Sequence, residues 1–117
     1  MNTQTLDGLV KTASLQWTPL VESGVDTTGI SVKSLRTEPA TGRAVSFVLR
    51  FEPGAKYPYR DHPAGEEPLV LSGSCVIEGA MLETGDLRLR GLRPQADRRD
   101  TSQQSAVVSL RVGESVP

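Results

Sequence analysis

Hydrophobic and polar residues alternate along residues 43–51, which is the period of a β-strand with one buried face. Residues 29–35 and 105–112 alternate in the same way and are rich in β-branched side chains, which favour strands. The pattern therefore predicts a strand in each of the three segments. The apolar face of residues 43–51 consists of Val45, Phe47, Leu49 and Phe51.

Two shorter apolar runs, residues 69–71 and 75–77, lie on either side of Gly73. They predict two continuously buried strands joined by a turn, and the pair Glu78-Gly79 predicts another turn directly afterwards. Glycines recur at short intervals along most of the chain, and the chain has 8 prolines, which leaves little room for helices. We therefore expect an all-β fold of short strands.

The chain has 117 residues, which is enough for one domain with a hydrophobic core but not for two. We expect residues 1–8 to be loose and residues 9–113 to form the domain. The net charge of −1 gives no reason to expect a nucleic acid or an anionic membrane as a partner. No apolar run approaches the length that a membrane-spanning helix needs.

Cysteine usage and the N-terminal residues bear on the compartment. Cys75 is the single cysteine and cannot form a disulfide within the chain. The N-terminal sequence MNTQTLDGLVKT lacks the basic and then apolar pattern of a signal peptide. Both observations predict a cytoplasmic protein in a reducing environment. Cys75 lies in the apolar run SCVI, so we expect it to be a small buried hydrophobic residue.

Candidate chemistry is concentrated in the stretch GAKYPYRDHPAGEEPLVLSG, residues 54–73. Gly54 is followed by five residues, then Arg60, Asp61 and His62, three more residues, Glu66, six more residues and Gly73. This spacing resembles the first motif of the cupin superfamily, in which two His, a Glu and two Gly occupy fixed positions. Every position of the motif is filled except that of the first His, where Arg60 stands.

A wider resemblance, over most of residues 14–112, is to the cupin domain of ChrR-type anti-sigma factors and related stand-alone cupins. It rests on a Trp-x-Pro start at Trp17, a Pro-Gly-Ala turn at residues 53–55, and the sequence GEEPLVLSG at residues 65–73. The resemblance implies a small antiparallel β-barrel of the double-sheet jelly-roll type, and by analogy a homodimer. Trp17 is expected to be a core residue or a dimer contact.

In a typical cupin, the resemblance implies, two His and a Glu of this motif and a His of a second motif hold a divalent metal. The second motif would start at Gly85 here, and its His position is occupied by Ala96. A shift of one residue would offer Asp97 instead, but Asp97 would then point to the other face unless a bulge intervened. Two of the four implied ligands are therefore replaced, by Arg60 and Ala96.

Arginine has no lone pair to donate and keeps its positive charge, so Arg60 also repels a dication. At ~4 Å and an effective dielectric constant near 20, two unit charges repel by about 4 kcal/mol, and a dication roughly doubles this. We therefore expect no resident cofactor; if a metal binds, His62 and Glu66 are the remaining ligand positions.

Arg60 and His62 are two residues apart, so they share one face of an extended strand, and the following turn can bring Glu66 opposite them. Two interpretations stay open: Arg60 and Glu66 form an ion pair that replaces the metal, or Arg60 binds the carboxylate or phosphate of a ligand. Tyr57 and Tyr59 have the opposite parity and are expected outside the barrel or at its mouth.

A second cluster of charge follows residue 85. Leu87 and Leu89 alternate with arginines, which predicts a strand with one solvated face. The acidic residues among the arginines predict a solvated, self-paired edge, and a contact surface for an anion or a protein is the alternative. A nucleic-acid platform is not expected, since no aromatic residues are interleaved. The arginines are Arg88, Arg90, Arg93, Arg98 and Arg99, and the acidic residues are Asp86, Asp97 and Asp100.

The leading hypothesis is a metal-free cupin that binds a small molecule, expected to be anionic, or acts as a regulatory interaction module. The ligand would contact Arg60, His62 and Glu66. A second hypothesis is a metal-dependent enzyme of dioxygenase or isomerase type with a rebuilt ligand set. A third is metal-free catalysis, with Glu66 or His62 as the base and Arg60 as an oxyanion clamp. The sequence does not separate catalysis from passive binding.

Overall fold

The computed structural model describes residues 9–42, 44–58, 66–89 and 99–112, and strands dominate these ranges. A short 3-10 helix, η1 (Thr12–Ser14), precedes the strands. The strands are β1 (Thr18–Pro19), β2 (Ile30–Thr37), β3 (Ala44–Phe51), β4 (Lys56–Pro58), β5 (Glu66–Ser72), β6 (Ser74–Ile77), β7 (Ala80–Glu83), β8 (Arg99–Ser102) and β9 (Ala106–Val112). The all-β prediction is confirmed, and the strands predicted around residues 29–35, 43–51 and 105–112 are β2, β3 and β9.

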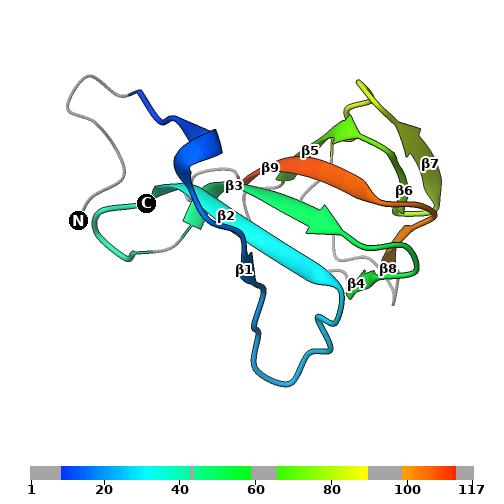
Figure 1. The fold of residues 1–117 in the computed structure, drawn as a ribbon, viewed down its shortest axis with the longest axis horizontal. Helices are drawn as coiled ribbons and strands as arrows, with labels where there is room; N and C mark the ends of the chain where they lie inside the picture. The colour runs from blue at the N-terminus through cyan, green and yellow to red at the C-terminus, as the bar shows by residue number, and fades with distance from the viewer. Residues whose placement is uncertain (1–8, 43, 59–65, 90–98, 113–117) are drawn as a thin grey trace.

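The strands form two antiparallel sheets (Figure 1). One sheet has five strands in the order β1-β2-β3-β9-β5, and the other has four in the order β4-β8-β6-β7. Strands far apart in the sequence therefore lie side by side, as β3 and β9 do with Leu49 opposite Val108. In the described part of the chain the sheets stay separate, as in a jelly roll, rather than joining into one closed ladder.

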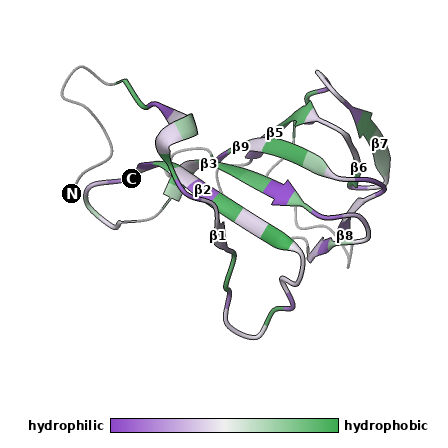
Figure 2. Ribbon diagram, viewed as in Figure 1, coloured by the Kyte–Doolittle hydropathy of each residue, from purple (hydrophilic) through white to green (hydrophobic). Residues whose placement is uncertain are grey.

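The hydrophobic core lies between the two sheets and is built by alternation along the strands. Green, hydrophobic bands alternate with paler or purple ones along β2 and β3 (Figure 2). Leu49 and Phe51 are 2% and 3% exposed, as the sequence pattern predicted, whereas Val45 and Phe47 of the same face are half-buried and Val48 of the other face is buried. The core cluster comprises Ile30, Leu49, Phe51, Ala55, Tyr57, Val70, Cys75, Ile77, Leu82, Ala106 and Val108. The predicted burial of Cys75 is thus confirmed.

The prediction of two continuously buried strands around Gly73 is wrong. β5 alternates, with Val70 1% exposed and Leu71 46% exposed, and the apolar residues of β6 also alternate between buried and half-buried. β5 and β6 belong to different sheets, so the chain crosses from one sheet to the other at Gly73. An unbroken apolar run in the sequence did not reveal that one of its faces reaches solvent.

The turn predicted at Glu78-Gly79 is confirmed. It joins β6 to β7, which pair with Ile77 opposite Ala80. Glu78 and Gly79 have φ values of 51° and 79°, and positive φ at both central positions is typical of the type I′ turn that matches the twist of a two-stranded hairpin.

Candidate functional site

Gly54 and Gly73, the first and last residues of the motif, have backbone conformations that favour glycine. Both have positive φ, 84° and 79°, which residues with a side chain rarely adopt. At Gly73 a Cβ atom would lie 1.9 Å from the carbonyl oxygen of Ser105, whereas at Gly54 it would meet nothing within 4 Å. These positions explain why the motif predicts the fold even where its metal ligands are replaced.

Of the three predicted site residues, the structure places Glu66, while Arg60 and His62 lie outside the described residues. Glu66 is the first residue of β5, opposite Val112 of β9, and it is 4% exposed. Pro68 and Val70, the next residues of the same parity, are also buried. Glu66 therefore lies on the inner face of the five-stranded sheet, where the motif expects a site residue.

The interior next to this face is closely packed. Side chains of both sheets enclose a small cavity. The centre of a water molecule could occupy about 10 Å³ of it, so the cavity has room for about one water. The surface that lines it is almost entirely apolar, although a tyrosine, a cysteine and an aspartate are among the lining residues. The lining residues are Leu49, Phe51, Tyr57, Pro68, Cys75, Ile77, Asp100, Val108 and Leu110.

Asp100 is the interior residue that sequence reasoning missed. It was assigned to the charged surface around the arginines, but it is 6% exposed and lines the interior cavity from β8. It lies opposite Tyr57 of β4, which is also buried. The segment Arg99–Ser102 consists of polar residues only, so no hydrophobic alternation marks its buried face.

The expectation that Tyr57 lies outside the barrel or at its mouth is wrong, because Tyr57 belongs to the core cluster. Its side chain is 5% exposed, and its ring packs edge-on against Phe51, with centroids 6.3 Å apart and an angle of 82° between the rings. The Tyr57 hydroxyl donates a hydrogen bond to Glu22 Oε1 at 3.2 Å. The alternation of side chains along a strand predicted that Tyr57 and Arg60 lie on opposite faces. It could not predict which of the two faces is the inner one. Tyr59 lies outside the described residues.

A metal site in a protein usually has three or four donors. In the ranges that the structure describes, which leave out His62, no three His, Cys, Asp or Glu side chains come together. The buried carboxylates of the described residues are Glu66, Asp100 and, at the turn after β6, Glu78, and Cys75 lies on the inner face of β6. Ala96 and Asp97, the second-motif positions, lie outside the described residues.

The residues after Gly85 expose the face opposite to the one predicted. Leu87 pairs with Leu69 at the edge of β5, yet Leu87 and Leu89 are 54% and 69% exposed. Arg88 points the other way, with its Nε 3.9 Å from Oε2 of Glu78, a carboxylate that is 8% exposed. The Arg88 side chain is itself 39% exposed, and Leu87 makes an isolated bridge only, so residues 86–89 do not form the predicted strand. Arg90, Arg93 and Arg98 lie outside the described residues.

Trp17 is not a core residue but lies over the cationic ends of two strand side chains. The Lys33 ammonium is 4.8 Å and the Arg50 guanidinium 4.5 Å from the centroid of its ring. Lys33 Nζ also donates a hydrogen bond to the Thr12 carbonyl at 3.0 Å. These contacts fasten the segment before β1 to β2 and β3.

Comparison with known proteins agrees with this architecture. The family model of ChrR cupin-like domains matches residues 5–113. The chain belongs to this family. The predicted cupin fold is therefore confirmed, together with the resemblance to ChrR-type domains.

Solved structures share the fold of this cupin domain at low sequence identity. A chain in the crystal structure of Rhodobacter sphaeroides SigE in complex with the anti-sigma ChrR is 19% identical, with a TM-score of 0.66 over 86% of this chain and 50% of that one. An acetylacetone dioxygenase from Acinetobacter johnsonii is 14% identical, with a TM-score of 0.69 over 97% of this chain and 78% of that one. An RmlC-like cupin from Shewanella frigidimarina is 15% identical, with a TM-score of 0.59 over 86% and 85%.

These neighbours establish the fold alone, because all three are less than 25% identical. The cupin domain spans half the length of the chain it matches in the ChrR complex. No curated protein matches the sequence.

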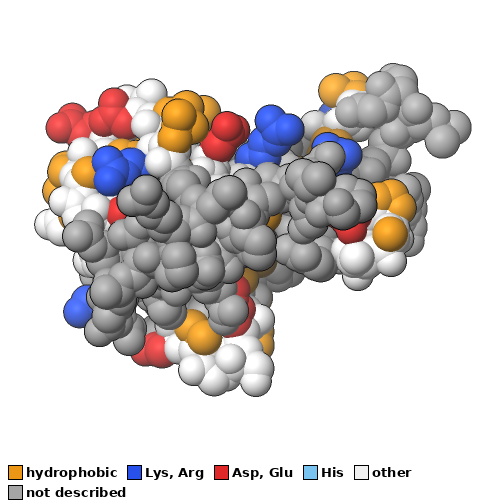
Figure 3. Space-filling model, turned by 180° about the vertical axis from the view of Figure 1, so that it is seen from behind, with side chains coloured by type: hydrophobic (Ala, Val, Ile, Leu, Met, Phe, Trp, Pro, Cys, Tyr) orange, Lys and Arg blue, Asp and Glu red, His pale blue; other side chains and the backbone are white. Residues whose placement is uncertain are grey.

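In the described residues, no helix is long and apolar enough to cross a membrane. On the face shown in Figure 3, acidic and basic side chains are interspersed with apolar ones.

Proposed function

We propose that this cupin domain is a ligand-binding or regulatory module without a resident metal, and that it takes a small anionic molecule at the Glu66 end of the interior. The observation that carries the proposal is Arg60, which stands in the cupin motif where a metal-binding His is expected. Glu66 of the same motif is 4% exposed on the inner face at the start of β5, so the motif reaches the interior. A fixed guanidinium charge there favours an anion and disfavours a dication.

A regulatory role is supported by membership of the ChrR cupin-like family and by the fold shared with the ChrR complex. By the same analogy we propose a cytoplasmic homodimer, which buries sheet edges against a second copy. Sedimentation velocity tests the dimer directly. A single monomeric species at tens of micromolar would end this part of the proposal.

The metal-free site is tested by elemental analysis of untagged protein purified without chelator. We expect zinc, iron, manganese and nickel far below one equivalent per chain. A thermal-shift screen of small carboxylates and phosphates should then raise the melting temperature of the wild type. Arg60→Lys is the matched variant, since it keeps the charge but loses bidentate binding, and Arg60→Ala removes both. One bound metal per chain, lost in both His62→Ala and Glu66→Gln, would refute the proposal.

The second candidate is a metal-dependent enzyme with a rebuilt ligand set, and one observation favours it. Asp100 supplies a second buried carboxylate to the interior, next to the face that carries Glu66. This candidate predicts an activity that disappears with a chelator and in both His62→Ala and Asp100→Asn. Activity that survives exhaustive chelation would eliminate the metal-dependent enzyme. Metal-free catalysis with Glu66 or His62 as the base would then be the remaining enzymatic hypothesis.

A further inference from the structure

Residues 85–89, here called the edge segment, run beside β5, the last strand of the five-stranded sheet (Figure 1). The Val70 amide of β5 donates a hydrogen bond to the Asp86 carbonyl at 3.0 Å. The Arg88 amide donates one to the Pro68 carbonyl of β5, also at 3.0 Å. Among the described residues, the edge segment is therefore the outermost backbone on this side of the sheet.

Leu87 presents its backbone groups to the open side of the edge segment. Its neighbours Asp86 and Arg88 use their carbonyl and amide toward β5, so the amide and carbonyl of Leu87 point away from β5. In the part of the chain that the structure describes, neither group of Leu87 makes a hydrogen bond. A donor and an acceptor that face outward from a sheet edge are a template for an extended strand of another chain.

The opposite edge of the same sheet is protected against such pairing. It is formed by β1, which is two residues long and ends at Pro19, a residue without an amide hydrogen. The edge segment, with the sequence GDLRL, has neither a proline nor a lysine. It also exposes the side chains of Leu87 and Leu89. This edge therefore lacks the features that keep a second strand away.

The charges of the edge segment are complementary to those of the same segment in a second copy. In an antiparallel pair with a two-fold axis at Leu87, the two Leu87 residues exchange both backbone hydrogen bonds. Each Asp86 then lies directly opposite the partner's Arg88, an arrangement of opposite charges that stabilises a strand pair. The exposed leucines of both copies lie together on the other face of the pair, where they cover apolar surface.

The contacts that these two charged side chains make within one chain leave atoms for a partner. Asp86 Oδ2 accepts a hydrogen bond from the Glu83 amide at 2.8 Å, which leaves its second oxygen. Arg88 approaches Glu78 through Nε, at 3.9 Å, which leaves the two terminal amino groups of the guanidinium. Both side chains reach solvent in the single chain.

We propose that the edge segment pairs antiparallel with the edge segment of a second copy, about a two-fold axis at Leu87. The two five-stranded sheets are thereby joined into one. The inference rests on the proposed homodimer and names the surface that forms it. Because a two-fold pair uses the open edge of both chains, assembly stops at the dimer.

Reversal of each charge tests the register. Sedimentation velocity over a concentration series gives the dimer Kd of the wild type, Asp86→Lys and Arg88→Glu. Each variant places like charges opposite one another twice per dimer, so each should raise Kd about thirtyfold. An equimolar mixture of the two variants should dimerise like the wild type, because every charge then meets its opposite. Glu52→Lys, a charge reversal at an exposed residue outside the edge segment, is the control and should leave Kd unchanged.

A cross-link tests the axis without any change of charge. Leu87→Cys, combined with Cys75→Ala so that the chain keeps one thiol, brings two cysteines together across the axis. The Cα atoms of such a hydrogen-bonded pair are about 5.5 Å apart, so a short bismaleimide should join the two chains. Met81→Cys in the same background is the control, since Met81 is similarly exposed on β7 of the other sheet and should stay uncross-linked.

The outcomes distinguish this interface from the homodimer itself. A wild type that stays monomeric at tens of micromolar overturns both. A wild-type dimer whose Kd is unchanged by both charge reversals, or that gives no cross-link in Leu87→Cys, overturns the edge segment as the interface and leaves the homodimer standing. Circular dichroism shows whether each variant folds, and the cross-link decides the question if a charge variant does not.

Discussion

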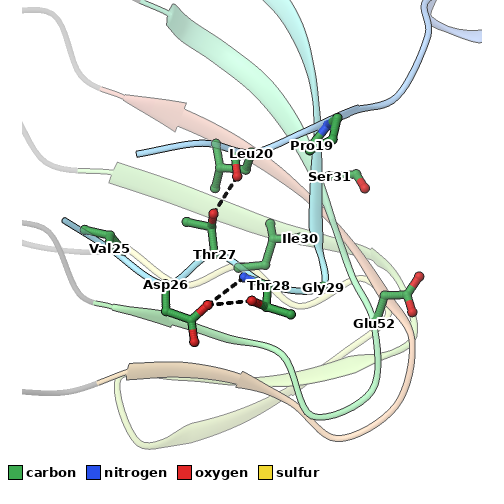
Figure 4. A pocket seen from close by; sticks show the side chains of 10 residues that line it. All are labelled: Pro19, Leu20, Val25, Asp26, Thr27, Thr28, Gly29, Ile30, Ser31 and Glu52. Carbon is green, nitrogen blue, oxygen red and sulfur yellow. Dashed lines mark hydrogen bonds between the residues drawn. The ribbon is translucent and has the colours of Figure 1, made fainter. Parts of the chain in front are cut away.

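The interior and the open groove along the β1–β2 connection, lined by Leu20, Asp26 and Glu52 among others (Figure 4), both carry carboxylates, but in different surroundings. Glu66 and Asp100 are 4% and 6% exposed and face a closely packed core. Asp26 and Glu52 are exposed at the edge of an open groove. A buried carboxylate must be hydrogen-bonded or paired, so its chemistry is coupled to the stability of the fold. An exposed carboxylate is already solvated, so it can meet a ligand at little cost but binds it weakly.

Tyr57 links the two regions. Its ring lines the interior cavity, and its hydroxyl binds Glu22, which lies in the same connection that forms the groove. The Leu20 side chain of that connection also packs against the core. A change in one region can therefore reach the other through a small number of contacts, and the following substitutions separate their contributions.

The largest effect is expected where the chain crosses between the sheets. Gly73→Ala would place Cβ 1.9 Å from a backbone oxygen that cannot move without shifting β9. We expect a loss of at least about 4 kcal/mol in the free energy of unfolding. Gly54→Ala, beside the groove, is the control, since its φ is also positive but the space is open, and it should cost about 1–2 kcal/mol. Urea denaturation measures both, and equal losses would contradict the steric explanation.

Truncation of one leucine in each region compares their packing. Leu49→Ala removes a side chain that is 2% exposed from the interior and should cost about 3 kcal/mol. Leu20→Ala removes a half-buried side chain from the groove floor and should cost about 1 kcal/mol. Thermal and urea denaturation give the difference. A loss for Leu20→Ala as large as that for Leu49→Ala would show that the groove belongs to the core.

The same change of charge tests the two kinds of carboxylate. Glu66→Gln keeps the shape of a buried side chain but removes its charge, and should lower stability by about 1–3 kcal/mol. Glu52→Gln changes an exposed side chain and should alter stability by less than about 0.5 kcal/mol. Chemical denaturation at neutral pH measures both variants. If Glu66→Gln proved neutral, the interior carboxylate would have no structural partner that requires its charge.

A small and local effect is expected at the contact between the two regions. Tyr57→Phe removes only the hydroxyl that donates a hydrogen bond to Glu22 and should cost about 1 kcal/mol. Hydrogen exchange should become faster in residues 20–29, while the amides of β3 and β9 keep their protection. Uniformly faster exchange would indicate global destabilisation instead of a local link. Thr18→Val, which removes a hydroxyl bonded to the Val32 carbonyl on the outside, is the control.

Sequence reasoning succeeded where one short pattern has one physical meaning. Alternation along β3 identified Leu49 and Phe51 as core residues, and the Glu78-Gly79 pair identified a turn. It failed at Tyr57, because parity relates neighbours on one strand but does not say which side another sheet will cover. It missed Asp100 because β8 has no apolar residues to mark its inner face. Of the predicted site, Glu66 is placed on the inner face, and the geometry of Arg60 and His62 stays a prediction.

The sequence by itself determined the all-β class, the cupin frame and the residues of its first motif, because strand period, glycine positions and motif spacing are local properties of the chain. The tertiary structure decided that Asp100 is buried, that Leu87 and Leu89 face outward, and that Asp26 and Glu52 meet in one groove. Each of these depends on contacts between segments distant in the sequence, such as Gly29 against Ala55. No local pattern encodes such contacts, because they exist only once the sheets have packed together.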